Sequence, residues 1–458
     1  MDDILEKAVE RMLSLGAEFA DARYQTVRRL HIQLVDASVR SLSEELTGGV
    51  CLRARMAGSW GYASTVLAEQ GTIMEAASKA AKHAKLGTAK GKRIAEMKAM
   101  RGSFPAKVKI RPEDVALEDK LALVKDLDQA QKVSPKVVNT NSVYSESIKK
   151  TLLVNSFNTR LDWEEVRGRT MVQTVASDGE RIEGFYDILD GSGGFELFKG
   201  MDTSKMGRGC AEEAVKMLKA KKCPSGYMTC ISDPMISGLL AHEVMGHASE
   251  ADEIVKKRSF LTTVVGEKVA SEHITMVDDG GLAGAHGFIP FDDEGTPSSR
   301  TTIIQDGVYK GYLHSLETAA EMGVRPTGNG RAQDHSRRVF VRMTNTFFEA
   351  GDWTLQEMIE GVDQGVLTDR FISGMEDPVA GGFEGKALRG FLIENGELTD
   401  MLRGFTLTGK ALEILKTVDA TGSQVSLDGG NCGKGTEDWV PVSSGGPYLR
   451  SKMILGGG

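Results

Sequence analysis

The chain has 458 residues, of which 40% are hydrophobic and 26% are charged, as is usual for a soluble globular protein. This composition excludes a fibrous or globally disordered chain, and the length predicts two large domains, at residues 1–200 and 201–458. The 64 acidic and 56 basic residues give a net charge of −8. An acidic chain is a poor nucleic-acid binder, because binding to phosphates depends on clustered Lys and Arg.

No segment has the pattern of a membrane span or of an export signal. The chain lacks an uninterrupted apolar run of about 18 residues. It opens with Met1, Asp2 and Asp3, which are acidic or neutral where a signal peptide would be basic. Five cysteines are a sparse and odd count, so we expect reduced thiols and a cytoplasmic location.

The first 200 residues predict a mixture of helices and antiparallel strands. Helical spacing of apolar residues or an alanine-rich composition predicts helices at residues 4–13, 67–86 and 112–131. Alternation of apolar and polar residues predicts strands at residues 30–34 and 50–56, and a series of short strands over residues 137–188. The glycine-rich segment 191–200 is interpreted as a domain boundary or a loop.

The second half predicts a further helix at residues 204–221 and then mainly strands and turns. Asp306-Gly307 and Asn395-Gly396 each separate two apolar runs, a pattern typical of β-hairpins. Thr354 and Glu357 form a capping box, which predicts the start of a short helix.

Residues 242–247 read His-Glu-Val-Met-Gly-His and follow a helix start, since Asp233 can cap the helix and Pro234 suits its first position. On an ideal α-helix, residues five apart point about 140° away from each other. His242 and His247 could therefore not bind one ion from a regular helix. A π-type turn, whose hydrogen bond spans five residues, would align them, and Gly246 would ease the distortion. The motif thus predicts an irregular helix between the two histidines.

Two imidazoles leave a catalytic zinc site in need of a third protein ligand and an open position for water. The candidates are Glu250, another histidine or a cysteine. Alternatively, His242 and His247 are hydrogen-bonded helix residues that bind no metal, and Glu250 orients an imidazole or is a surface acid.

One of the five cysteines differs from the rest. Cys432 lies in a polar, glycine-rich segment that we interpret as a loop, where Lys434 would favour the thiolate. The other four lie in apolar or helical patterns typical of inert, buried thiols: Cys51, Cys210, Cys223 and Cys230.

The sequence resembles the TldD/PmbA family of modulators of DNA gyrase, which are regarded as metallopeptidases. The resemblance covers nearly the whole chain and is carried by residues 242–252, 16–23, 292–295, 307–313, 327–330, 342–346, 392–397 and 429–450. It implies an α+β fold, with an N-terminal mixed α/β domain and a C-terminal, largely antiparallel β domain that carries a metal-binding helix.

The resemblance also implies a ligand set. In the family, zinc is held by the two motif histidines and a late cysteine, and the motif glutamate is catalytic. These roles correspond to His242, His247, Cys432 and Glu243 here. Because the chain retains the His-Glu motif, it resembles the catalytic branch rather than the paralogous branch that lacks it. The family forms dimers, so we expect a homodimer or a heterodimer with a motif-lacking paralogue.

These observations predict a zinc metallopeptidase that hydrolyses unfolded or short peptides, with Glu243 taking a proton from the attacking water. An extended peptide could add as a strand to a sheet edge. The rival hypothesis is a non-catalytic scaffold or peptide-binding partner with a closed, structural metal site. A third hypothesis is nucleotide binding, because residues 404–410 read Gly-x-x-x-x-Gly-Lys, although Ala411 replaces the Ser or Thr of a phosphate loop.

Overall fold

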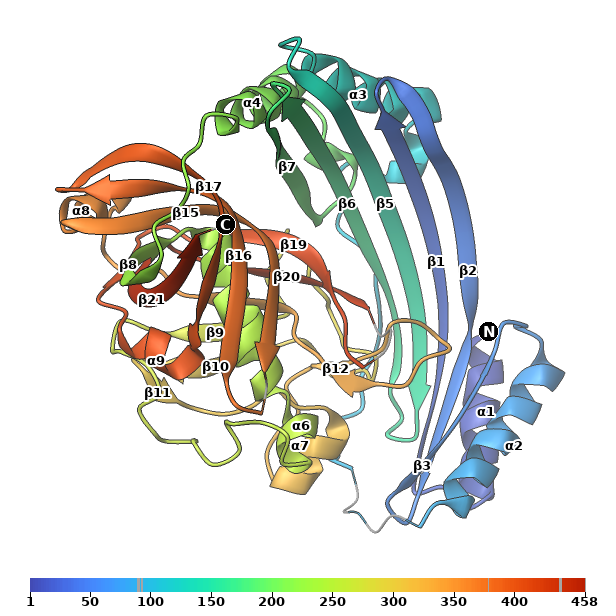
Figure 1. Cartoon of the computed structure of the whole chain (residues 1–458). Helices are drawn as coiled ribbons and strands as arrows, with labels where there is room; N and C mark the ends of the chain where they lie inside the picture. The colour runs from blue at the N-terminus through green and yellow to red at the C-terminus, as the bar shows by residue number, and fades with distance from the viewer. Residues whose placement is uncertain (89–90, 92–93, 378, 436–438, 458) are drawn as a thin grey trace.

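The computed structural model describes the chain except for residues 89, 90, 92, 93, 378, 436–438 and 458. A long, curved sheet from the N-terminal half stands beside a C-terminal half built from shorter strands and helices (Figure 1). The fold is α+β, as the resemblance implies.

The long sheet has the strand order β3-β2-β1-β5-β6-β4, and β7 also pairs with β6. Its strands are β1 (Phe19–Val35), β2 (Ser38–Met56), β3 (Ser59–Thr65), β4 (Arg101–Phe104), β5 (Val137–Asn155), β6 (Arg160–Ser177) and β7 (Ile182–Ser192). The helices of this half are α1 (Asp2–Ser14), α2 (Gln70–Leu86) and α3 (Leu117–Ala130). The helix α4 (Thr203–Met217) follows residue 200 but packs on β6 and β7.

The prediction of short strands in this half was wrong. Residues 30–34 and 50–56 are parts of β1 and β2, and residues 137–188 form the long strands β5 and β6 and most of β7. Along β1, residues 19–23 are buried on both faces, and only then does burial alternate. A strand whose cover changes along its length shows regular alternation only locally, so the pattern reveals a fragment of it.

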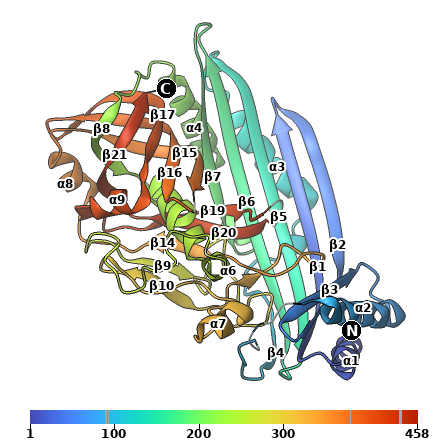
Figure 2. The ribbon, with the colours of Figure 1, turned by 60° about the horizontal axis from the view of Figure 1, so that its bottom comes forward.

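The outer face of the sheet is covered by helices. Leu30, Ile32 and Leu34 of β1 pack with Val124 of α3, while α1 and α2 cover the other end of the sheet (Figure 2). The predicted helix at residues 112–131 is a short 3-10 turn, Pro112–Asp114, followed by α3. The opposite face of the sheet is turned toward the C-terminal half.

Two six-stranded sheets form the C-terminal half, in the orders β11-β10-β9-β14-β20-β19 and β17-β16-β15-β8-β21-β18. Because β21 pairs with both β8 and β17, five strands of the second sheet close into a ring. The strands are β8 (Gly226–Ser232), β9 (Met276–Asp279), β10 (Arg300–Gln305), β11 (Val308–Tyr309), β12 (Gly330–Arg331), β13 (Phe340–Val341), β14 (Asn345–Phe348), β15 (Gln364–Asp377), β16 (Gly382–Glu394), β17 (Glu397–Lys410), β18 (Ala420–Thr421), β19 (Ser426–Cys432), β20 (Val440–Gly446) and β21 (Leu449–Gly457). The helices are α5 (Pro234–Leu239), α6 (Ala251–Val255), α7 (Leu316–Met322), α8 (Leu355–Glu360) and α9 (Ala411–Lys416).

The predicted hairpins are confirmed. Asp306 and Gly307 join β10 to β11, and Asn395 and Gly396 join β16 to β17, all four with positive φ angles as the favoured two-residue turns require. The capping box of Thr354 starts α8. Residues 404–410 lie within β17, paired with β16, so the interpretation of this segment as a phosphate loop is wrong. None of the helices in the described part of the chain is long and apolar enough to span a bilayer.

Two glycines of α4 provide a test of this packing. A Cβ at Gly207 would lie 2.7 Å from the carbonyl oxygen of Leu127 in α3, whereas a Cβ at Gly209 would meet nothing within 4 Å. We expect Gly207→Ala to lower the free energy of unfolding by about 1–3 kcal/mol. Gly209→Ala should raise it by about 0.5–1 kcal/mol, because alanine favours the helix. Urea unfolding of both variants measures this, and equal effects would contradict the packing of α4 on α3.

Candidate metal centre

The helix that carries the motif starts as the sequence predicts. Asp233 caps α5 through the backbone N–H of Met235, and its other contacts come from β15, where the hydroxyl of Thr368 donates to it at 2.7 Å. Pro234 occupies the first turn. The helix packs against β15, β19 and β20 and lies between the two C-terminal sheets, so its direction is fixed by strands from both sheets.

After Leu239 the helix becomes a π-helical turn, Leu240–Gly246, followed by a 3-10 turn, His247–Ser249. The backbone N–H of His247 donates to the carbonyl oxygen of His242, a hydrogen bond that spans five residues. The predicted irregularity between the two histidines is therefore confirmed. Their rings come within 5.1 Å of each other, centroid to centroid.

Gly246 allows the close contact on which this turn depends. A Cβ at this position would lie 2.0 Å from the sulfur of Met343 and 3.1 Å from the carbonyl oxygen of Ala241. Met343 is fully buried, so it has little room to withdraw. The glycine is needed for its small size here, and its φ is not positive.

The fold brings the side chains of His242, His247 and Cys432 together, with one potential ligand atom of each within 4.8 Å of the other two. The sulfur of Cys432 lies 3.2 Å from Nε2 of His247. His242 is buried, and its Nδ1 makes no hydrogen bond within the described residues. Two imidazole nitrogens and a thiolate are donors that suit a divalent metal of intermediate softness. Their role as metal ligands remains a prediction.

Cys432 does not lie in a loop, as its glycine-rich surroundings led us to expect. It is the last residue of β19 and is 5% exposed. Gly429 serves close packing, since a Cβ there would lie 2.3 Å from a carboxylate oxygen of Asp190 and 2.5 Å from Cβ of His286, whereas a Cβ at Gly430 would meet nothing within 4 Å. Glycine in a strand can mark a loop or a close backbone approach, and the sequence alone does not distinguish them.

Electrostatics favour the ionised form of this cysteine. Burial opposes the thiolate, but the imidazoles of His242 and His247 outweigh it and hold the pKa of Cys432 well below its usual value. Burial likewise disfavours a charged His247, yet Cys432 and Glu250 raise the pKa of His247 well above normal. The two shifts support each other, because a charged imidazole favours the thiolate and a thiolate favours the charged imidazole.

Behind the centre lies a buried ionic network that the sequence only partly revealed. Glu250 lies 3.5 Å from Nδ1 of His247 and accepts a hydrogen bond from Lys434 at 2.7 Å. Lys434 also donates to Asp252. Lys434 was expected to favour the thiolate, but it instead neutralises these carboxylates. Glu250 is thus a buried residue that orients His247, and it is not one of the three grouped ligand residues.

Arg342, which sequence reasoning missed, completes the network. Its Nη2 donates to the carbonyl oxygen of Cys432 at 2.6 Å, and its Nε lies 3.7 Å from Glu250. The side chain is fully buried. One arginine therefore links the backbone of the cysteine to the carboxylate that orients the histidine. The only sequence signal for it was its place in one of the family-like segments.

Glu243 lies at the edge of the centre. Its carboxylate is 3.8 Å from Nε2 of His247, and its side chain is 25% exposed, whereas Glu250 is 1% exposed. The two glutamates of the motif region thus differ in access: Glu243 can meet solvent or a ligand, but Glu250 cannot. The four other cysteines are buried, and burial raises the pKa of each thiol, to about 11 for Cys210 and about 12 for Cys223. This confirms that they are buried, and their inertness stays a prediction.

A cavity of about 760 Å³ borders the centre. It lies between the inner face of the long sheet and the C-terminal half and reaches Asn431 and Val440. Asn431 precedes Cys432 in β19, and Val440 is the register partner of Cys432 in β20. The cavity thus reaches the residues beside Cys432, although neither Cys432 nor the two histidines line it.

Family models match three successive parts of the chain. They are described as PmbA/TldA metallopeptidase domain 1, central domain and C-terminal domain, and they match residues 20–84, 110–221 and 225–457. A metalloprotease of Methanocaldococcus jannaschii is 34% identical over 98% of both chains.

The chain belongs to the TldD/PmbA family. A zinc metalloprotease TldD homolog of Saccharolobus solfataricus is 24% identical over 99% of both chains. The crystal structure of TldE from Thermococcus kodakarensis superposes with a TM-score of 0.80, covers 99% of this chain and 100% of its own, and is 20% identical. That likeness confirms the fold alone.

The ionic network gives a test that needs no metal. Glu250→Gln would leave Lys434 and Arg342 beside a neutral amide, so we expect the free energy of unfolding to fall by about 3–5 kcal/mol at pH 7. Glu253→Gln is the control. Glu253 is partly exposed and lies 3.9 Å from Lys434, farther than Glu250, so its loss should lower the free energy of unfolding by less than about 1 kcal/mol.

The same variant has a pH signature. The pKa of Glu250 is lowered despite burial, chiefly by Lys434 and then His247. A lowered pKa in the folded state stabilises the fold above the unfolded pKa of about 4.3 and loses this effect as the pH falls. The deficit of Glu250→Gln should therefore shrink in unfolding experiments below pH 4, and a constant deficit would contradict the assignment.

Proposed function

We propose that this TldD/PmbA family member is a zinc-dependent peptidase that hydrolyses unfolded or short peptides. The observation that carries the proposal is the grouping of His242, His247 and Cys432 beside the accessible carboxylate of Glu243. The names of relatives support a metal ion and a peptidase activity, and one of these names specifies zinc. Three protein donors leave a position for water, as catalytic zinc sites require.

A bound zinc ion would lower the pKa of water to near neutrality and polarise the scissile carbonyl group. Glu243 then has two tasks. Its carboxylate accepts a proton from the attacking water, and it delivers this proton to the departing amine. Its partial exposure lets water and peptide reach it, while the buried Glu250 keeps His247 oriented.

The strand β19 offers a place for the peptide backbone. It is the last strand of its sheet, paired on one side with β20, and it ends at Cys432. An extended peptide that adds to this edge would be held mainly by backbone hydrogen bonds, which permits loose sequence preference. This fits unfolded or short substrates rather than folded proteins.

We also propose, from the family resemblance, that the working form is a cytoplasmic dimer of like chains or with a motif-lacking paralogue. The outer edge of β2 could be covered by the second chain of such a dimer. The strand β3 pairs only with residues 50–56 of β2, and on the earlier part of the strand the apolar side chains of Val39, Leu42 and Leu46 are exposed. Light scattering of the purified chain, alone and mixed with such a paralogue, tests this.

The zinc site predicts a clear change in metal content. Purified wild-type chain should contain about one zinc per chain, and Cys432→Ser should lose most of it, because a hydroxyl is a poor substitute for a thiolate. Elemental analysis measures both. Cys210→Ser is the matched control, since Cys210 is equally buried but lies in α4, and it should keep its zinc. Unchanged zinc in Cys432→Ser would remove this residue from the ligand set.

The role of Glu243 predicts a separation of metal binding from activity. Glu243→Gln should keep zinc but lower kcat for peptide hydrolysis by about 10²–10⁴-fold, because an amide cannot accept the proton. Zinc content and the release of new amino termini are measured on the same sample. Full activity of the variant would reject the assigned role, and an inactive wild type with a full zinc site would favour the scaffold hypothesis.

A further inference from the structure

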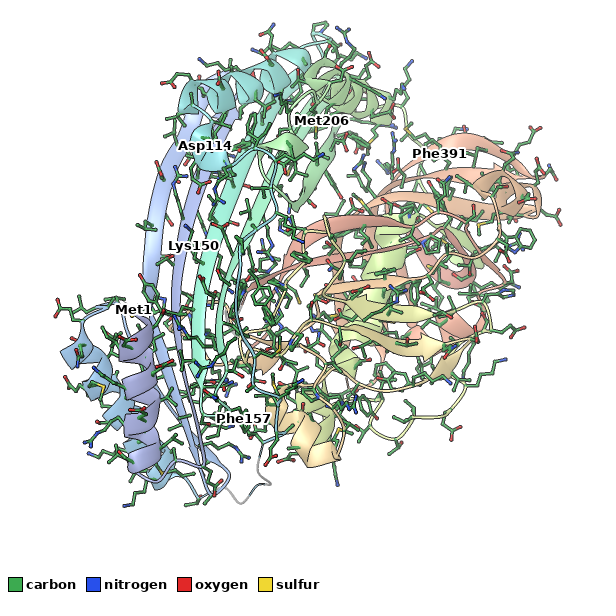
Figure 3. The ribbon with its side chains drawn as sticks, turned by 180° about the vertical axis from the view of Figure 1, so that it is seen from behind. Met1, Asp114, Lys150, Phe157, Met206 and Phe391 are labelled. Atoms are coloured by element: carbon green, nitrogen blue, oxygen red, sulfur yellow. The ribbon has the colours of Figure 1, made fainter. Side chains whose placement is uncertain are left out.

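The inner face of the long sheet presents an ordered cationic surface to the cavity. Alternate residues of β1, β5 and β6 point to this face and line the cavity, and their register places them in rows. Arg29, Ser147 and Arg167 form one row, and His31, Ser145 and Arg169 form the next. Figure 3 shows side chains filling the region between this sheet, on which Lys150 is labelled, and the C-terminal half.

Basic residues outnumber acidic ones in this cavity. Five of its lining residues are Arg or Lys and three are Asp or Glu. Arg29, Arg169 and Arg331 form no ion pair with a carboxylate of the described residues. We call these three residues the arginine cluster. A carboxylate entering the cavity would therefore meet more basic than acidic side chains, three of them arginines without an ion pair in the described part of the chain.

The acidic residues of the cavity are already occupied. Glu165 pairs with Arg167 at 2.8 Å and with Lys149 at 3.6 Å. Asp293 lies 3.2 Å from Arg23 and 3.3 Å from Lys149. Glu146 contacts Lys120 at 2.8 Å, on the side of the sheet that α3 covers. These carboxylates thus have closer partners than the arginine cluster, and Glu165 and Asp293 act on Arg331 only through their charge, without an ion pair.

Arg169 and Arg331 flank the strand pair that ends at the metal centre. Arg169 donates to the carbonyl oxygen of Gly429 in β19. Its register partners are Ser145 in β5 and Asp190 in β7, and the charge of Arg169 counteracts the burial that raises the pKa of Asp190. Arg331 is 3% exposed and donates to the carbonyl oxygens of Met343 and Pro441. Burial, and then the charge of Arg167, lowers the pKa of Arg331 to about 10, which still leaves it charged at neutral pH.

The distance along β19 between Gly429 and Cys432 indicates which residue of a bound peptide would lie beside Arg169. Gly429 precedes Cys432 by three residues, which is about 10 Å of extended chain. The N–H of Gly429 donates to Asp190 and its carbonyl accepts from Arg169, so a peptide could add to the edge of β19 only between Gly429 and the metal centre. A peptide with its scissile bond at the metal centre would therefore leave the strand edge beside Arg169, about three residues from that bond. Arg29 lies one row further, opposite Glu45 of β2 in the register, and is exposed, so a ligand can reach its guanidinium.

We propose that the arginine cluster binds a carboxylate of the peptide, so that the substrates are peptides with negative charge about three residues from the cleaved bond. This rests on the proposed peptidase function. The carboxylate is either an acidic side chain or the free C-terminus, because a guanidinium recognises both in the same way. The cavity would thus select among peptides that the strand edge alone would bind equally.

The experiment uses zinc-loaded protein and a series of peptides based on one uncharged sequence. Glu or Gln is placed at one position after another, and every peptide is made with a free and with an amidated C-terminus. We expect KM to be about fivefold lower for Glu than for Gln at one position, or for the free acid than for the amide, with kcat unchanged. Binding of the same peptides to Glu243→Gln protein is measured by fluorescence anisotropy. A difference between Glu and Gln would identify a side chain as the bound carboxylate, and a difference between the free acid and the amide would identify the C-terminus.

Variants locate the effect. Arg29→Ala and Arg169→Ala should each remove most of the preference, measured as the ratio of KM for neutral peptides to KM for charged peptides, and Arg169→Lys should restore part of it. Arg28→Ala is the matched control, because Arg28 precedes Arg29, pairs with Glu44 and should change nothing.

The outcomes separate this proposal from the peptidase function. Equal binding of charged and neutral peptides would show that the arginine cluster does not bind a carboxylate, even if cleavage occurs. A preference that survives in the Arg29→Ala/Arg169→Ala double variant would show the same. Preferential binding without cleavage would support the cluster and reject the peptidase function.

Discussion

The centre depends on the five-residue hydrogen bond from the N–H of His247 to the carbonyl of His242, because only this π-type spacing puts both imidazoles on one side of the helix. A regular α-helix with the same sequence would direct them about 140° apart. The turn is fixed from outside: Asp233 holds the helix start to β15, and Gly246 lets Met343 pack against its end. Such turns are rare in proteins and frequent at functional sites.

Charge compensation joins parts of the chain that are far apart in sequence. Cys432 is brought to the histidines by β19, and its carbonyl is held by Arg342. Arg342 also faces Glu250, which Lys434 neutralises and which orients His247. Burying so many ionic groups is unfavourable unless each has its partner, so the network favours one arrangement of the ligands. The long sheet then supplies the wall of the adjoining cavity.

Local patterns predicted the parts of the fold that depend on near neighbours. The capped start at Asp233, the irregular motif and the hairpins at Asn395 and Asp306 are examples, because each is decided within a few residues. The strand β19 and the full length of β5 were not predictable, since the covering of their faces comes from distant elements. Arg342 lies 90 residues from Cys432 in sequence, so no local pattern could connect them. Cys432 itself was expected from the resemblance, although its surroundings were misread as a loop.

The central claim is that His242, His247 and Cys432 together bind one zinc ion. Crystals of the purified chain grown with zinc, with diffraction measured on both sides of the zinc absorption edge, test it most directly. We expect a single anomalous peak about 2.0–2.1 Å from a nitrogen of each imidazole and about 2.3 Å from the sulfur. An absent peak, with the two rings turned away from each other and from the thiol, would contradict it.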